Sequence, residues 1–234
     1  MGAAIGWGAL AASSLVLGAL LGVVRAWPSR AVGLVLAFGA GALISAVSFE
    51  LAEEGIEVGG ARPVAIGLAV GAVTYFVCDR LIDRRWPASD GAGTALALGA
   101  FLDGIPEQAV LGIGLAAGHG VGIGLLVAIF VSNLPEAVGS ASDMRADGYS
   151  SAAITRLWIV VAVLCALATL GGYAVADVTS GGFNAAVNGF AAGALLVMLV
   201  DSMIPDATRK SGPVAGLATT LGFALATGLS TLTT

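Results

Sequence analysis

Charged side chains are scarce in this 234-residue sequence: they make up 11% of the residues, whereas hydrophobic residues make up 58%. The two cysteines, Cys78 and Cys165, lack Cys-x-x-Cys spacing, and we interpret them as small core residues rather than a redox or zinc motif. No polar stretch is longer than a short loop, which argues against a separate water-soluble domain. The absence of a basic patch argues against nucleic-acid binding.

Apolar runs and 35 glycines fill the rest of the chain, and the mean hydropathy is +0.97. This composition is typical of an all-α polytopic membrane protein, and we expect one transmembrane domain over residues 1–234 in the lipid bilayer. The chain enters an apolar run without a basic region or cleavage site, which favours a first span over a signal peptide. The pattern predicts eight transmembrane helices, at about 4–24, 31–52, 62–82, 94–117, 120–143, 152–176, 184–206 and 212–233.

The basic residues predict the orientation. All but one of the ten lie in or beside the odd-numbered loops, and Arg62 is the exception. The positive-inside rule then places these loops in the cytoplasm and both termini outside, in the plasma (inner) membrane. Glycine-rich helix faces allow close packing and permit a homodimer.

Two related motifs interrupt the fourth and fifth predicted spans: Asp-Gly-Ile-Pro-Glu at 103–107 and Ser-Asn-Leu-Pro-Glu at 132–136. A proline inside a helix frees the carbonyl four residues earlier, and an ionisable residue within a membrane usually marks a functional site. Since a short turn joins the two helices, we expect both motifs at the same depth. They predict an oxygen-rich metal site made of Asp103, Glu107, Asn133, Glu136 and Ser132.

Repulsion between these acids favours a bound divalent cation, for which carboxylate and amide oxygens are suitable ligands. The alternative is a proline kink with protonated carboxylates hydrogen-bonded between helices.

Further acids flank the motifs. Residues Glu50, Glu53, Glu54 and Glu57 share one face of the second span, as a cation entrance or as a solvated helix end. Asp201 lies one turn before Pro205, as an exit ligand or as a partner of nearby basic residues. We include Glu50, Glu53 and Asp201 among the predicted metal-binding residues.

The motif pair resembles the fourth and fifth helices of the ZIP (Zrt/Irt-like) divalent metal transporters, which read roughly His-Asn-x-Pro-Glu-Gly and His/Gln-Glu/Asp-x-Pro-Glu-Gly. The stretches AFGAGALISAVSFELAEE and FAAGALLVMLVDSMIPD are similar to the second and seventh helices of that family. The resemblance implies a metal site that keeps Glu107, Asn133 and Glu136 and has Asp103 as a substituted ligand.

Several positions depart from the ZIP pattern. Asp103 replaces a histidine, Gly104 an asparagine, and Ser132 a histidine or glutamine. Where many members carry a bridging glutamate in the sixth helix, LCALATLGG offers only Thr169. We therefore expect one metal site, whose oxygen ligands favour Mn²⁺, Fe²⁺ or Mg²⁺, although zinc also binds carboxylates tightly.

These patterns predict a transporter that moves a divalent cation of the zinc, iron or manganese type into the cytoplasm, with the metal as substrate and no tightly bound cofactor. One alternative is a proton- or monovalent-cation-linked transporter, and another is a non-transporting metal-sensing membrane protein. An enzyme is not expected, because the motifs of membrane aspartyl proteases and the histidines of metal-dependent hydrolases are missing.

Overall fold

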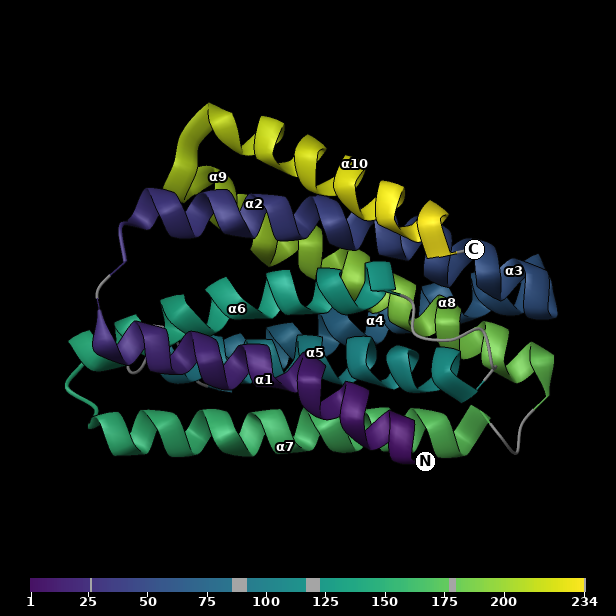
Figure 1. The fold of residues 1–234 in the computed structure, drawn as a ribbon, viewed down its shortest axis with the longest axis horizontal. Coiled ribbons are helices and arrows are strands. Elements are labelled where there is room, and N and C mark those ends of the chain that lie inside the picture. Colours follow the sequence, from purple (N-terminus) through teal and green to yellow (C-terminus); the bar gives the residue numbers. More distant parts are fainter. Residues whose placement is uncertain (26, 86–91, 117–122, 177–179, 234) are drawn as a thin grey trace.

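A computed structural model describes residues 1–25, 27–85, 92–116, 123–176 and 180–233. Within these ranges every regular element is helical (Figure 1). The elements are α1 (Gly2–Val24), α2 (Ser29–Ser45), η1 (Ala46–Glu53), α3 (Glu54–Gly59), α4 (Ala61–Arg85), α5 (Ala92–Ala116), α6 (Ile123–Ala146), α7 (Ser151–Ala176), α8 (Gly181–Met198), η3 (Leu199–Met203), α9 (Ile204–Ser211), η4 (Gly212–Val214) and α10 (Ala215–Thr233).

Two of the long helices contain a wider, π-helical segment. The segment η1 joins α2 to α3, and η3 joins α8 to α9, so that each set forms one continuous run of helix. The elements α3 and α9 end at Gly60 (φ 89°) and Gly212 (φ 70°), and glycine adopts such positive φ angles without strain. Insertions of π-helix are frequently found at functional sites, and both of these lie in spans that carry predicted metal-binding acids.

Six helical runs among the described residues are long and apolar enough to cross a membrane: Gly2–Val24, Ser29–Gly59, Ala61–Leu81, Leu125–Ala146, Ser151–Ala176 and Gly181–Leu229. The chain is therefore an all-α integral membrane protein. The number of eight spans stays a prediction, because α5 is not among the six and the last run covers two predicted spans. Both chain ends lie at the same end of the bundle (Figure 1).

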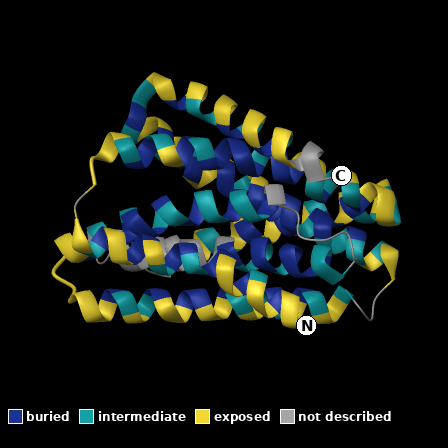
Figure 2. Ribbon diagram, viewed as in Figure 1, coloured by how far each residue is buried: buried dark blue, intermediate teal, exposed yellow. Residues whose placement is uncertain are grey.

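The helices pack in two groups. In the first, α1 contacts α6 and α7, and α5 contacts α7 and α6; in the second, α4 contacts α8 and α10 contacts α2. Contacts of α2 with α6 and of α5 with α8 join the groups. Figure 2 shows buried residues inside the bundle and exposed ones on its outside. Large exposed apolar residues such as Leu217 and Val200 suit contact with lipid rather than water.

Glycines bring several helix pairs into close contact, most clearly α5 and α7. A Cβ at Gly172 would overlap the carbonyl oxygen of Ala109, and one at Gly112 would overlap the carbonyl oxygen of Thr169. The two backbones therefore touch directly, as small residues allow in membrane helices. This contact fixes α5, one of the two motif-bearing helices, against α7.

Replacing Gly172 with alanine should therefore force α5 and α7 apart and lower the free energy of unfolding by about 1–3 kcal/mol, the usual effect of overpacking. The neighbouring Gly171 has open space around its Cβ position, so Gly171→Ala is the matched control. Thermal unfolding in detergent, followed by circular dichroism, should show a lower midpoint for Gly172→Ala alone. Equal midpoints for the two variants would contradict the close contact.

Candidate metal site

The two proline motifs lie on neighbouring helices. Pro106 is inside α5 and Pro135 inside α6, and the two helices pack against each other. Leu111 of α5 and Ile129 of α6 belong to the same buried hydrophobic cluster. The structure thus joins the two helices through a common core, as expected of a site shared between them.

The polar residues of the motifs are largely buried. Glu107, Ser132 and Asn133 are each 1% exposed, and Glu136 is half-buried. Asp103 lies in α5, but its side chain is outside the described part of the structure. A carboxylate at this depth is stable only with a cation, a proton or hydrogen-bond donors beside it.

The three sides of α6 have different neighbours. The carbonyl of Leu134 lies against Gly18 of α1, and the backbone of Ser132 lies against Gly39 of α2. The hydroxyl of Ser132 donates to the carbonyl of Ile129 in its own helix, at 3.1 Å. At 100° per residue, Asn133 and Glu136 fall on a third side of α6, away from the contact with α1. Besides α1 and α2, α6 also contacts α5, which carries the other motif.

A buried hydrogen bond fixes the helix turn that carries Glu107. The hydroxyl of Thr169 in α7 donates to Oε1 of Gln108 at 2.5 Å, and both side chains are fully buried. One turn away, the thiol sulfur of Cys165 lies 2.6 Å from the Cβ position of Gly104, so it fills the space that a side chain there would take. The sequence alone identified Thr169 as a polar group in this stretch but missed the Gln108 bond and the Cys165 contact.

The amide of Asn133 has an oxygen suited to a metal and a nitrogen that is a donor. Its Nδ2 is buried without a hydrogen-bond partner in the described structure. Gln108 Nε2 and Glu50 Oε2 are two other buried atoms of this kind. Unsatisfied buried polar atoms are uncommon in native proteins, and those of Asn133 and Gln108, within or next to the motifs, suit a polar ligand or water.

The predicted entrance residues occupy different environments. Glu50, in η1, is half-buried, and its carboxylate accepts a hydrogen bond from the backbone of Leu125 near the start of α6. At a rise of 1.5 Å per residue, that contact is about 12 Å along the helix axis from Asn133. Glu53 is exposed. The structure therefore brings Glu50 to the motif-bearing helix and leaves Glu53 outside.

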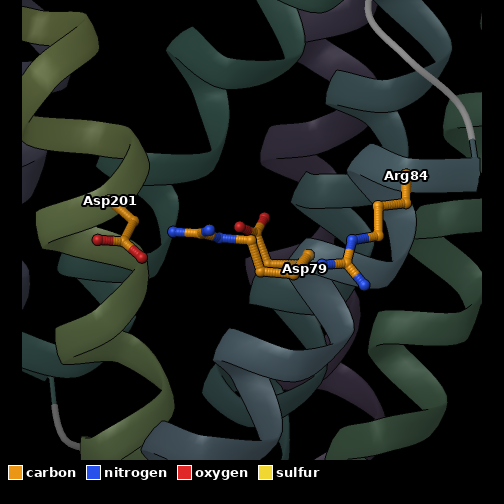
Figure 3. Close-up of a pocket in the computed structure, with 4 residues that line it drawn as sticks. Asp79, Arg84 and Asp201 are labelled. Carbon is orange, nitrogen blue, oxygen red and sulfur yellow. The ribbon is translucent and has the colours of Figure 1, made fainter.

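Asp201 lies apart from the motifs. It is exposed in η3 and lines an open pocket of about 480 Å³ together with Asp79, Arg80 and Arg84 of α4. Figure 3 shows Asp201 on one side of this pocket and Arg84 on the other, with Asp79 between them. The two arginines reduce the negative potential that would attract a cation here.

No three described side chains of histidine, cysteine, aspartate or glutamate gather closely enough to hold a metal. The donors that the structure does describe at the motifs are the carboxylates of Glu107 and Glu136 and the amide of Asn133. Two carboxylates are sufficient to neutralise one divalent cation.

Known proteins resemble the chain at modest identity. An Arabidopsis thaliana protein named as a candidate zinc transporter is 28% identical over 211 residues, which cover 86% of this chain and 34% of that protein. Zinc transporter SLC39A7 from mouse is 27% identical over 157 residues, or 62% of this chain and 33% of the mouse protein. The human protein of the same name is 27% identical over 128 residues, or 52% of this chain and 26% of its own length.

The chain thus spans about a third or less of the length of these relatives. No family model matches the sequence. The relatives are named as zinc transporters, in agreement with the expectation of a protein without enzymatic activity. SLC39A7 is a ZIP family member, and this similarity at modest identity confirms the resemblance of the chain to the ZIP transporters.

Proposed function

We propose that this protein moves a divalent metal cation across the membrane through the carboxylates of α5 and α6. The observation that carries the proposal is the burial of Glu107 and Asn133, both 1% exposed, on adjacent helices that each contain a proline. The zinc transporters to which the chain is similar support a metal as the cargo.

The chemistry of the donors suits a cargo that must be bound and then released. Glu107 and Glu136 neutralise the two positive charges, and the amide oxygen of Asn133 adds a neutral ligand. Asp103, four residues before Glu107, adds a carboxylate on the same helix face. Pro106 and Pro135 free two backbone carbonyls, which are further oxygen ligands or partners for water.

A route through the membrane follows from the flanking acids. Glu50 and Glu53 attract the cation at the outer end, and Glu50 connects that end to α6 through the backbone of Leu125. At the cytoplasmic end Asp201 is the proposed exit ligand, and the nearby Arg80 and Arg84 would weaken its hold on the cation and so favour release. In this arrangement eight spans cross the plasma membrane, with both termini on its outer side. Zn²⁺, Fe²⁺ or Mn²⁺ enters the cell, and the protein needs no tightly bound cofactor. Glycine-rich faces allow a homodimer.

A second candidate is transport of protons or monovalent cations by the same carboxylates. It is favoured by the burial of Glu107, which is 1% exposed, because a proton neutralises a buried carboxylate as a metal cation does. In that case the buried carboxylates exchange protons and no divalent metal binds. A non-transporting metal sensor is the remaining alternative, suggested by the missing bridging glutamate.

Replacing Glu107 or Glu136 with glutamine removes one ligand charge and keeps the side-chain size. We expect metal uptake into vesicles with reconstituted protein to fall by at least about tenfold, since even outer partners of metal ligands contribute that much affinity. Asp147→Asn, at an exposed position outside the proposed route, is the control for charge and should transport normally. Undiminished uptake by both site variants would refute the proposed route.

Metal competition distinguishes the candidate cargoes. Oxygen ligands favour Mn²⁺, Fe²⁺ or Mg²⁺ over zinc, but we expect the general order of divalent affinities to outweigh that preference. Zn²⁺ should then bind more tightly than Fe²⁺ and Mn²⁺, and Mg²⁺ more weakly. Elemental analysis of the purified protein and displacement of bound Mn²⁺ in a calorimetric titration measure this order. A protein that binds none of these ions but carries protons in vesicles would establish the second candidate instead.

A further inference from the structure

A half-buried ion pair lies at the end of α9. The ammonium of Lys210 is 2.7 Å from the carboxylate of Asp206, and both side chains are 22% exposed. The same carboxylate also pairs with Arg209, whose side chain is 75% exposed. Asp206 therefore holds two cations, one packed inside the protein and one in solvent.

The inner cation lies between two other helices. The Cβ of Lys210 and the backbone of Ser211 pack against Gly33 of α2. The Lys210 ammonium lies 3.7 Å from the Cβ position of Gly139 in α6. Lys210 thus reaches from α9, past α2, to the helix that carries the second proline motif.

The position along α6 connects this ion pair to the metal site. Gly139 follows Glu136 by three residues, which is about 4.5 Å of helix rise and about 60° around the axis. From Glu136, Gly139 lies toward the end of α6 that leads into α7, where α9 also turns into α10 (Figure 1). A fixed positive charge at this point repels a divalent cation that leaves Glu136 in that direction.

We propose that the Lys210–Asp206 ion pair is the inner gate of the metal route. This inference rests on the proposed function. With the gate closed, the Lys210 ammonium lies beside Gly139, where a leaving metal ion would pass, and forms an ion pair with Asp206. A metal ion released from Glu136 displaces the ammonium from Asp206, and the flexible lysine side chain moves into solvent. Arg209 has no such role, because its guanidinium already lies in solvent.

The competing explanation is an ordinary ion pair between residues four apart, which only stabilises the end of a helix. The two explanations differ in whether Lys210 controls access to Gly139. A Cβ at position 139 makes only an ordinary contact, 3.7 Å from the Lys210 ammonium, so we choose Gly139→Cys as the probe. Cys78→Ser removes the partly exposed native thiol, and Cys165 is fully buried.

The experiment measures how fast a membrane-impermeant maleimide labels Gly139→Cys from the face predicted to be cytoplasmic, in sealed vesicles. We expect Lys210→Ala to speed labelling by about fivefold or more, the factor expected from loss of one partly buried ion pair. Arg209→Ala removes the other partner of the same carboxylate and should leave the rate within about twofold. Lys210→Arg should restore slow labelling because it keeps a cation on Asp206.

The reactivity of the Gly139→Cys thiol would by itself change the labelling rate in the direction opposite to the one we expect. A nearby ammonium favours the reactive thiolate, so losing Lys210 would by itself slow labelling. A faster rate therefore reports access. Equal rates in the Lys210→Ala and Arg209→Ala variants, whether raised or unchanged, would overturn the gate.

Folding of each variant is checked by its thermal midpoint in detergent, and Lys210→Arg keeps the proposal testable if Lys210→Ala unfolds. Zinc uptake by the wild-type protein is measured in the same vesicles. Absent uptake with faster labelling of Lys210→Ala would refute the proposed function and leave Lys210 as an access barrier. Normal uptake with unchanged labelling would refute the gate alone.

Discussion

The main physical constraint on this structure is that it buries carboxylates between apolar helices, which is energetically unfavourable. Glu107 is almost completely buried in a chain in which 58% of the residues are hydrophobic. Moving a carboxylate from water into such surroundings costs several kcal/mol unless a cation or a proton neutralises it. In the proposed site the same cost favours cations, because a divalent ion would neutralise the charges of Glu107 and Glu136. A transport route follows if the ion can enter and leave.

Rigid packing keeps these carboxylates in place. Backbone contact at Gly172 and the buried bond from Thr169 to Gln108 hold α5 against α7. The site-bearing helices meet the second group of helices along α2 and α8, and Lys210 of α9 reaches the same boundary beside Gly139. The buried acids and the proposed gate therefore both lie at the boundary between the two helix groups. Small residues there leave room for polar side chains.

Sequence reasoning predicted the helical class and placed both motifs on neighbouring helices, because hydrophobic length and proline position are local properties. It missed the π-helical segments. As a result, the predicted span 31–52 is shorter than the helical run from Ser29 to Gly59 that contains it. It did not predict that two arginines of α4 line a pocket with Asp201, because the two segments lie far apart in the sequence. Likewise, the partner of Thr169 depends on how α5 packs against α7, which no local pattern specifies.

The coordination of bound zinc tests the central claim most directly. X-ray absorption spectroscopy of the purified, zinc-loaded protein reads the ligand atoms from their distances, which are about 2.0–2.2 Å for oxygen and about 2.3 Å for sulfur. Our account predicts an oxygen-only shell that is lost in the Glu107→Gln and Glu136→Gln variants. A sulfur ligand, or an unchanged spectrum in both variants, would contradict it.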